Sequence, residues 1–422
     1  MHFYTSININ YLPKARVLAS SIKEHCRNCK FSLVLVDDIP EEINLENEPF
    51  DEIVSVDQLG IEVENLKLWI FQHTVVELCT AVKGPALVKF LMEGSDKVVY
   101  LDPDIAVFDD LDCLNQLLDE HDVIITPHQT IPERNKQDII NNEICSLKHG
   151  IYNFGFYAVK NSENGLRYAE WWRDRLIDFC YDDIPNGIFT DQRWGDLAPA
   201  MFDGIFIWKD PGCNVSTWNL TNRHITKQDD TYYVNHSKLK FYHFSGFDSG
   251  DQKIMLDLYA KDNSYLFDLR DWYIEQQDAQ EQKKYGNGYG KSKFNYYDNG
   301  EIVKKEERRM IRERMDLLEY FKDTNPYVVE QERSYYHWYK NEMTLDEQIP
   351  KITLKLEDYK EKLSQINFFL EETETLKRAK EALTEEVREL QKEKYNLESK
   401  MNDILNSRTW RVHTKIAKIL GR

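Results

Sequence analysis

The stretch Val98-Val99-Tyr100-Leu101-Asp102-Pro103-Asp104-Ile105 decides the fold. Its first half is an apolar run with β-branched residues, which predicts a buried strand. Its second half places two carboxylates two residues apart, with a proline that fixes a turn between them. Two carboxylates at the end of a strand can hold one hard cation, Mg²⁺ or Mn²⁺, and leave positions open for substrate phosphates. The alternative is a pair of solvated aspartates in a turn.

The segments on either side of this stretch predict an α/β domain. Apolar runs at residues 31–36 and 123–126 have strand character, and the amphipathic stretches 13–25 and 75–93 predict helices. Strands that alternate with helices favour a largely parallel sheet, whose ligand sites lie at the carboxyl ends of the strands. We therefore look for the chemistry directly after the apolar runs.

Composition narrows the class of protein. The chain has 422 residues, 41% of them hydrophobic, with only 17 Gly and 12 Pro, so we expect two or three folded units and no collagen-like or low-complexity region. A net charge of −19 disfavours a general nucleic-acid binder. The seven scattered cysteines favour reduced thiols over a disulfide framework. The residues after Met1 do not resemble a signal peptide, and no run of about 18 apolar residues occurs, so we expect a cytoplasmic protein without a membrane span.

The pattern divides the chain into four parts. We expect a catalytic domain over residues 1–250, a helical extension over 251–345 with a Gly-rich boundary loop at 285–290, a coiled coil over 346–405 and a basic amphipathic tail over 406–422. The coiled coil rests on strict seven-residue spacing, with an earlier phase offset near Thr373. The spaced residues are Leu376, Leu383, Leu390, Leu397 and Ile404.

Two partners follow from these C-terminal patterns. Leu at one core position of the heptad, with Lys380 and Lys394 at the other, favours a homo-oligomer and most simply a parallel dimer. A single helix folded back on the body is the alternative. The tail has five basic residues and no acidic residue, which fits peripheral contact with the inner face of an anionic membrane. A solvated tail, or one packed within a dimer, fits the same composition.

Three further clusters contain residues suited to a polar site. They are Tyr152-Asn153-Phe154-Gly155, Thr190-Asp191-Gln192-Arg193-Trp194 and Tyr242-His243-Phe244-Ser245-Gly246. Each has a simple structural explanation: Asn153 as a turn residue, Asp191 as a helix N-cap, and His243 as a buried histidine with its hydrogen bonds satisfied. Their order behind the two aspartates carries more information than any one of them.

This ordered set resembles a known family. Together with Asn10-Tyr11 in the first loop, the motifs are similar to those of bacterial sugar-nucleotide glycosyltransferases of the GT-A (nucleotide-diphospho-sugar transferase) fold, closest to glycosyltransferase family 8. The resemblance covers about residues 1–250. It implies a mixed, mainly parallel sheet, a divalent cation (Mn²⁺ or Mg²⁺) and a nucleotide-sugar donor. It says little about the acceptor.

The resemblance also implies roles for single residues. Thr5, Asn10 and Tyr11 correspond to the nucleoside pocket, and Asp102, Asp104 and His243 to the metal ligands. Asn153 would face the donor sugar, and Gly155, Ser245 and Gly246 would also bind the donor. Asp191 and Gln192 would lie beside the anomeric carbon as the catalytic pair. From the residues alone, Lys83 adds a positive charge near the phosphates unless it is simply solvated.

One segment of the sequence is a candidate for binding the acceptor sugar. Two other positions differ from the pattern of the family. Trp218 and Asn219 combine an aromatic face with an amide, which suits a sugar, although a core Trp and a turn Asn fit as well. The lysine that the family carries after its His-Gly segment is absent, because Phe247-Asp248-Ser249-Gly250 stands there. Pro85 stands where the family often has an arginine.

Two functions therefore compete. The first is a metal-dependent glycosyltransferase that moves a hexose from a nucleotide-diphosphate sugar, UDP-linked by family resemblance, to a bacterial surface glycan or a glycoprotein with retention of configuration. The second is an inactive scaffold that oligomerises through its coiled coil and organises partner enzymes at the membrane. The complete set Asp102, Asp104 and His243 favours the enzyme.

Overall fold

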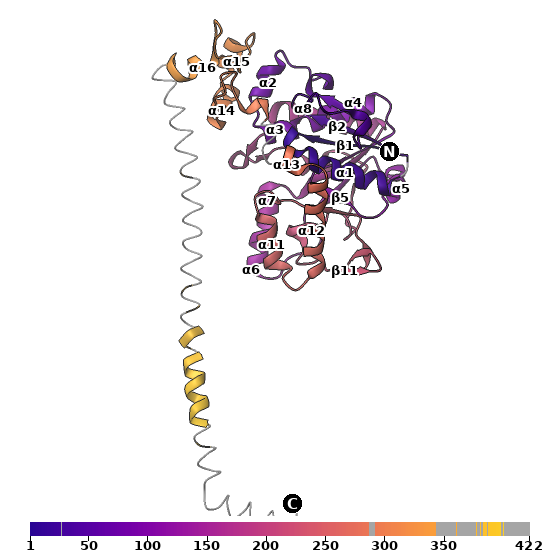
Figure 1. Ribbon diagram of the computed structural model, residues 1–422, viewed down its shortest axis with the longest axis vertical. Helices are drawn as coiled ribbons and strands as arrows, with labels where there is room; N and C mark the ends of the chain where they lie inside the picture. The colour runs from indigo at the N-terminus through magenta and orange to yellow at the C-terminus, as the bar shows by residue number, and fades with distance from the viewer. Residues whose placement is uncertain are drawn as a thin grey trace, which may run out of the picture. The chain divides into compact units, whose positions relative to one another are not determined.

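The computed structural model describes residues 1–26, 28–286 and 292–342, and of the remainder residues 360, 377, 380, 383–385, 387–397 and 400. The chain forms two compact units, Met1–Glu342 and Met343–Arg422. Figure 1 shows the helices and strands of the first unit. The central positions of the expected boundary loop, residues 287–290, lie outside the described residues, as do the basic tail and most of the expected coiled coil.

A seven-stranded mixed sheet forms the centre of the first unit. Strand β7 runs antiparallel to its neighbours β4 and β6, and the other neighbouring strands are parallel, so the sheet is mainly parallel as expected. In spatial order the strands are β10 (Ile205–Ile207), β6 (Val123–Pro127), β7 (Tyr152–Lys160), β4 (Lys97–Leu101), β1 (His2–Ile7), β2 (Lys30–Leu35) and β3 (Glu52–Ser55).

The other short strands of the described residues form three small sheets. The pairings are β5 (Ile105–Val107) with β14 (Phe241–His243), β8 (Asp182–Asp183) with β9 (Ile188–Phe189), and β11 (Ile225–Gln228) with β12 (Thr231–Val234) and β13 (Ser237–Lys238). The antiparallel pair of β5 and β14 joins the end of the central sheet to a segment more than 130 residues further along the chain.

The helices of the first half are α1 (Leu12–His25), α2 (Leu66–Phe71), α3 (Val75–Ala81), α4 (Lys83–Met92), α5 (Asp112–Glu120), α6 (Lys136–Asp138), α7 (Cys145–His149) and α8 (Glu163–Phe179). Those that follow are α9 (Gln192–Gly195), α10 (Ala198–Met201), α11 (Asp251–Tyr259), α12 (Ser264–Ala279), α13 (Gln282–Tyr285), α14 (Lys305–Glu313), α15 (Met315–Phe321) and α16 (Tyr335–His337). Among the 3₁₀ and π turns, η1 (Ile9–Tyr11), η4 (Ile139–Ile144) and η6 (Thr217–Asn219) lie near the site described below.

Helices cover both faces of the sheet because side chains alternate along each strand. Val99 and Leu101 of β4 point to one face, where they share a core with α1 and α5. Tyr100, between them, points to the other face and stacks on Tyr157 of β7 at a centroid distance of 5.0 Å. Trp172 of α8 packs against that same Tyr157 ring. The result is a sheet between two layers of helices, which confirms the α/β domain with a largely parallel sheet that the strand and helix patterns predicted.

The stretch 75–93 is helical as predicted, but it forms two helices, α3 and α4, that meet at Val82. Pro85 has no N–H to donate to the carbonyl of Ala81, so the helical ladder cannot continue through it. Gly84 then allows α4 to pack closely on α8, since a Cβ at this position would lie 2.7 Å from the Cα of Arg173.

The compact unit continues past residue 250. Helices α11 and α12 share a hydrophobic core with β5 and β14, in which Tyr273 of α12 stacks on Phe244 with a centroid distance of 3.8 Å. The structure therefore shows no boundary at residue 250 within the unit Met1–Glu342. An end of the catalytic domain at this residue stays a prediction. All seven cysteines are free thiols.

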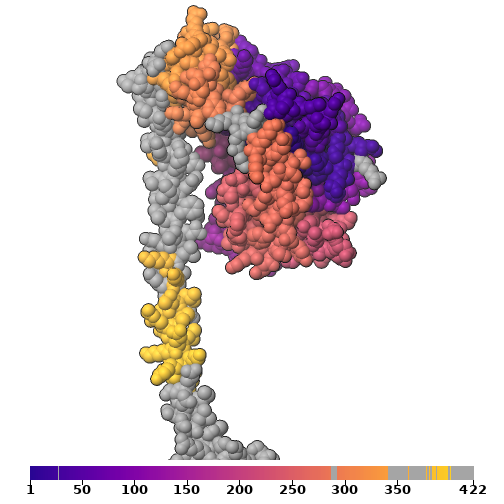
Figure 2. Space-filling model, viewed as in Figure 1, coloured from indigo at the N-terminus to yellow at the C-terminus, as the bar shows by residue number. Residues whose placement is uncertain are grey.

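Residues 292–342 return to the N-terminal half of the unit, as the orange surface beside the violet one shows in Figure 2. The Asn65 amide donates to the carbonyls of Lys322 and Thr324, each at 2.7 Å. The buried guanidinium of Arg308 donates to the carbonyls of Phe71 and His73. Phe71 is the last residue of α2, and His73 lies two residues beyond it. The segment therefore fixes the junction between α2 and α3.

His73 at this junction makes stability depend on pH. Its Nδ1 lies 2.7 Å from the carbonyl of Trp69, and burial lowers its pKa to about 4 despite the nearby carboxylate of Glu77, with Arg312 and Arg308 adding to the decrease. Since the unfolded chain takes up this proton near pH 6.5, the stabilisation is complete above that pH and is lost as the pH falls toward 4. We expect His73 to account for roughly 2 kcal/mol of lost unfolding free energy between about pH 7 and about pH 4.5.

Chemical denaturation of the wild type and of His73→Gln at both pH values measures this contribution. Gln keeps an N–H donor but does not titrate, so the pH dependence should decrease by that amount. His236→Gln, at an exposed position, is the control and should leave the difference between the two pH values as in the wild type. Equal pH dependence in the wild type and His73→Gln would contradict this assignment.

The described residues of the second unit are helical. Three members of the heptad series fall among them, and in the single chain the side chains of Leu383, Leu390 and Leu397 are 62%, 58% and 59% exposed. The coiled coil itself stays a prediction. A search of the described residues finds no helix with the length and apolar character needed to cross a membrane.

Candidate active site

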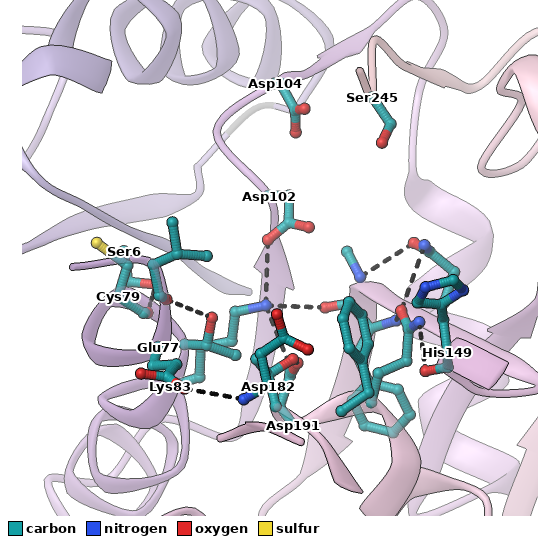
Figure 3. A pocket seen from close by; sticks show the side chains of 18 of the residues that line it. Ser6, Glu77, Cys79, Lys83, Asp102, Asp104, His149, Asp182, Asp191 and Ser245 are labelled. Atoms are coloured by element: carbon teal, nitrogen blue, oxygen red, sulfur yellow. Dashed lines mark hydrogen bonds and ion pairs between the residues drawn. The ribbon is translucent and has the colours of Figure 1, made fainter. Parts of the chain in front are cut away.

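A cavity of about 680 Å³ opens at the carboxyl ends of β1 and β4. Side chains from η1, α3, α4, the β4–β5 turn, β7, the β9–α9 turn and β14 line it. Figure 3 shows Asp104 and Asp102 at the top, Asp182 and Asp191 below them, and Glu77 at the left. The cavity thus lies where the sheet topology predicted the chemistry.

Asp102, Asp104 and His243 form a group that can hold a metal ion. The carboxylates lie on the turn between β4 and β5, and β14 pairs with β5 so that His243 stands opposite Ile105. His243 Nε2 is 3.1 Å from Asp104 Oδ1 and 3.9 Å from Asp102 Oδ2. One ligand atom from each residue lies within 4.8 Å of the other two. Two carboxylates and an imidazole suit Mn²⁺ or Mg²⁺ with open positions for a substrate.

The histidine is oriented by a second side chain. Asn214, in the left-handed backbone region at φ 51°, places Oδ1 3.2 Å from His243 Nδ1, so that Nε2 faces the carboxylates. Burial opposes the charge on His243, but Asp104 outweighs it and raises the pKa of the imidazole. The pKa of Asp104 is correspondingly lowered by His243 against the effect of its own burial.

Gly155 on β7 is required by the close packing behind these ligands. A Cβ on Gly155 would lie 2.5 Å from His243 Cε1, 2.7 Å from Asn153 Oδ1 and 2.8 Å from Asp102 Oδ2. No side chain fits at those distances without displacing a ligand. The backbone of β7 therefore forms the wall against which the three-residue group is assembled.

Lys83, the first residue of α4, is buried between two carboxylates. Its Nζ lies 3.1 Å from Asp102 Oδ1, 3.0 Å from Asp191 Oδ2 and 4.3 Å from the centroid of the Tyr100 ring. Burial alone would lower the pKa of the ammonium, but Asp102 and Asp191 raise it well above its usual value. The structure thus keeps one fixed positive charge beside the metal-binding carboxylates.

Asp191 and Gln192 come from the turn that follows β9. Thr190 before them has φ 44°, a strained conformation for a β-branched residue, and its hydroxyl donates to Asp191 Oδ1 at 3.2 Å. Gln192 accepts from the backbone N–H of Phe154 and donates to the carbonyl of His149 at 3.0 Å. The conformation of this turn therefore sets both side chains in the middle of the cavity.

The remaining end of the cavity begins at Tyr11. Its hydroxyl donates to Asp248 Oδ2 at 2.8 Å, and Lys14 Nζ lies 2.5 Å from the same carboxylate oxygen. Asp248 belongs to the segment that stands in place of the family's lysine. In this chain the segment Phe247-Asp248-Ser249-Gly250 therefore binds the start of helix α1 through Lys14, and none of its own residues is a cation.

The structure brings most of the predicted site residues into the cavity. Those that line it are Tyr11, Lys83, Asp102, Asp104, Asn153, Gly155, Asp191, Gln192, Trp218, His243 and Ser245. Four others do not line it. Thr5 is fully buried in β1, Asn10 lies in η1, Gly246 forms the turn after β14, and Asn219 uses its side chain within η6 to bond Ser216 N and Asn214 O.

Sequence reasoning missed several residues of the site. Asn214 and His128 contact the side chain of Asn153, and Thr74, Asp182, Phe189 and Lys305 line the half of the cavity far from His243. Asn214 follows Gly212-Cys213, a turn signal that marks a special backbone conformation. Lys305 comes from a segment far along the chain, and no local pattern connects it with the cavity.

Comparison with known proteins finds a family model that matches the first part of this domain. The model of glycosyl transferase family 8 matches residues 2–164. Two uncharacterized Bacillus subtilis (strain 168) proteins are related: YfnD is 26% identical over 252 residues, 58% of this chain and 78% of YfnD, and YfnF is 28% identical over 165 residues, 39% of this chain and 51% of YfnF.

Solved structures with a similar fold include two glycosyltransferases. GlyE from Streptococcus pneumoniae TIGR4 is 20% identical over 51% of this chain and 46% of its own, with a TM-score of 0.32. The galactosyltransferase LgtC, solved in complex with donor and acceptor sugar analogs, is 15% identical over 58% of this chain and 87% of its own, with a TM-score of 0.35. This chain thus spans about half of the YfnF and GlyE chains.

The family match covers the strands that carry Asp102, Asp104, Asn153 and Gly155, and the sheet around them is mixed and mainly parallel. The chain is a glycosyltransferase whose residues 2–164 match the model of family 8 and belong to an α/β domain with a mixed, mainly parallel sheet.

Proposed function

We propose that this glycosyltransferase moves a hexose from a UDP-sugar to a bacterial surface glycan or a glycoprotein in a reaction that requires a divalent cation. The observation that carries the proposal is the group Asp102, Asp104 and His243, with Lys83 beside it. A cation held by this group supplies Lewis-acid stabilisation of the negative charge that develops on the departing nucleoside diphosphate.

The residues of the chain account for the other needs of the reaction. Tyr11, held through its hydroxyl by Asp248, offers its ring to the nucleoside end of the donor. Asn153, whose Oδ1 accepts from Asn214 and from Gly155 N, stands beside the donor sugar. Asp191 and Gln192 lie in the middle of the cavity, where the positive character of the anomeric carbon develops.

We extend the proposal to retention of configuration. The resemblance to the family supports it, and so does the state of Asp191. Its two oxygens are already engaged by Lys83 and by the Thr190 hydroxyl, an arrangement that suits electrostatic stabilisation better than removal of a proton from an acceptor. The anomeric signal of the product in proton NMR distinguishes retention from inversion.

Donor hydrolysis tests the proposal without knowledge of the acceptor. The purified full chain is incubated with UDP-glucose, UDP-galactose and UDP-N-acetylglucosamine, each with Mn²⁺, with Mg²⁺ or with EDTA, and release of UDP is measured. We expect release from one donor class only when a divalent cation is present. Release that persists unchanged in EDTA contradicts the metal site, and a folded protein that releases UDP from no donor favours the scaffold.

We also propose that the C-terminal unit makes the protein a homodimer. The support is the seven-residue spacing in the sequence and the exposure of Leu383, Leu390 and Leu397 on the described helical residues. Exposed leucines at this spacing match the core positions of a two-stranded coiled coil. A second copy of the same helix has its leucines at the same spacing and can therefore pack against them.

Truncation after Glu342 separates the two units. We expect the truncated chain to show about two fifths of the full-length mass in light scattering, because a shortened monomer replaces the dimer, and to hydrolyse the donor at the full-length rate, because the cavity lies within Met1–Glu342. If the truncated chain keeps the oligomeric state of the full chain, the coiled coil is not what holds the oligomer together.

A further inference from the structure

The proposed donor site gives no role to one part of the cavity, which we call the far half. It is lined by Thr74 to Val76 at the start of α3, Ser146 and His149 of α7, Asp182 and Phe189 of the β8–β9 pair, and Lys305 of α14. In Figure 3 Asp182 lies close to Asp191, and His149 lies to their right. This part of the cavity is therefore the candidate position for the second substrate.

The far half is connected directly to the reacting centre. Phe189 precedes Asp191 by two residues, and Gln192 donates to the carbonyl of His149 at 3.0 Å. A molecule that rests on Phe189 and His149 therefore lies next to the Asp191–Gln192 pair. The same contacts tie the position of that molecule to the position of the two side chains.

The surface of this half has two chemical characters. Phe189 and His149 meet edge to face at a centroid distance of 4.7 Å, and the Val76 side chain beside them is 73% exposed. These apolar faces suit the C–H face of a pyranose ring. At the rim Lys305 Nζ lies 3.8 Å from Asp182 Oδ2, and both side chains are about half exposed. A loose, solvated ion pair of this kind is weak, so sugar hydroxyls can replace it.

The charge of the cavity disfavours a second diphosphate as ligand. Among the described residues that line it, the lysines are Lys83, buried between Asp102 and Asp191, and Lys305, paired with Asp182. No arginine is among these lining residues, so a phosphorylated acceptor would meet carboxylates with too few cations to match them. A neutral sugar suits the surface better.

The wall that carries Asp182 is joined to α14 through Glu77. Glu77, which is 1% exposed, accepts from the backbone N–H of Asp182 at 2.9 Å and pairs with Arg312 of α14 at 3.4 Å. The Arg312 guanidinium lies 3.9 Å from the centroid of the Tyr181 ring. Helix α14 lies outside residues 2–164, the part that matches the family model.

We propose that Phe189, His149, Asp182 and Lys305 form the acceptor subsite, that its ligand is a neutral hexopyranose at the end of a glycan chain, and that Lys305 of α14 sets its specificity. The ring of the acceptor stacks on Phe189 and His149, and its hydroxyls bond Asp182 and Lys305. This inference rests on the proposed transfer reaction and names the class of its second substrate.

Competition between hydrolysis and transfer tests the subsite. The full chain is given Mn²⁺ and the UDP-sugar it hydrolyses, together with the p-nitrophenyl glycosides of glucose, galactose and N-acetylglucosamine or with p-nitrophenyl glucuronide. We expect a neutral glycoside to be glycosylated or to slow hydrolysis by excluding water. In Lys305→Ala and in Phe189→Leu, the glycoside concentration that gives half of this effect should rise about tenfold, with a much smaller change in the KM of the donor.

Lys253→Ala is the matched control. Lys253 is as exposed as Lys305, forms an ion pair with Asp257 on α11 and does not line the cavity, so its variant should behave as the wild type. Hydrolysis that no neutral glycoside affects, a preference for the glucuronide, or half-effect concentrations that are unchanged in both variants would each overturn the subsite. If the wild type hydrolyses no donor under these conditions, the proposed function itself fails, and the subsite fails with it.

Discussion

Asp104→Asn is expected to lower cation-dependent hydrolysis of the donor by about 10²–10³-fold, the usual effect of removing one group that stabilises developing negative charge. Asp104 is one of three candidate ligands and is the carboxylate nearest His243, at 3.1 Å. Asn is almost the same size and can still accept a hydrogen bond from the imidazole. The variant should therefore keep the melting temperature of the wild type to within a few degrees, and the loss should be one of metal binding.

Asp109→Asn is the control for this variant. Asp109 lies five residues further along, is buried to a similar extent and pairs with Lys238 and Lys240 outside the cavity. Its replacement should leave hydrolysis unchanged at saturating Mn²⁺. Full activity of Asp104→Asn with the metal dependence of the wild type would remove Asp104 from the site.

Lys83→Met is expected to cost stability as well as activity. The substitution keeps the length of the side chain but leaves Asp191, whose side chain is 5% exposed, with no cation beside it. Removing one partner of a buried ion pair typically costs about 3–5 kcal/mol, and we expect the free energy of unfolding to fall by that amount. Hydrolysis should be lost too, since the fixed charge beside Asp102 is gone.

Two further variants make the Lys83 result specific. Lys83→Met combined with Asp191→Asn should regain part of the lost stability without regaining activity, because no buried charge is then left unpaired. Lys89→Met removes a partly exposed lysine of the same helix whose partner Glu93 is at the surface, and it should change the free energy of unfolding very little. Denaturant titration measures all three. A single variant Lys83→Met that is as stable as the wild type would show that Asp191 does not need its partner.

The sequence predicted the parts of the site that follow directly from strands. Asp102 and Asp104 come immediately after β4, and the apolar run through Val99, Tyr100 and Leu101 predicted a buried strand, which the structure confirms. His243 could be placed only through the order of the motifs, since its position opposite Ile105 depends on pairing of β14 with β5. Local pattern therefore predicted the two carboxylates, and the resemblance to a family predicted the third ligand.

Other features depend on contacts that no local pattern encodes. Lys83 was predicted near the phosphates, but its contact with Asp191 joins residues 108 positions apart. Lys305 reaches the cavity because Arg308 and Arg312 fix α14 to the α2–α3 junction and to Glu77. Hydrophobic periodicity predicted one helix through Val82 because it does not register the missing N–H of Pro85. Tertiary packing decides each of these three features.

Equilibrium binding of UDP tests the central claim most directly. Titration calorimetry of the wild type and of Asp102→Asn is carried out with UDP in the presence of Mn²⁺ and again in EDTA. The account predicts tight binding to the wild type with Mn²⁺, a loss of about tenfold or more in EDTA, and no effect of the metal on the variant. Equal affinity of the wild type for UDP in Mn²⁺ and in EDTA would contradict a metal-dependent donor site at Asp102, Asp104 and His243.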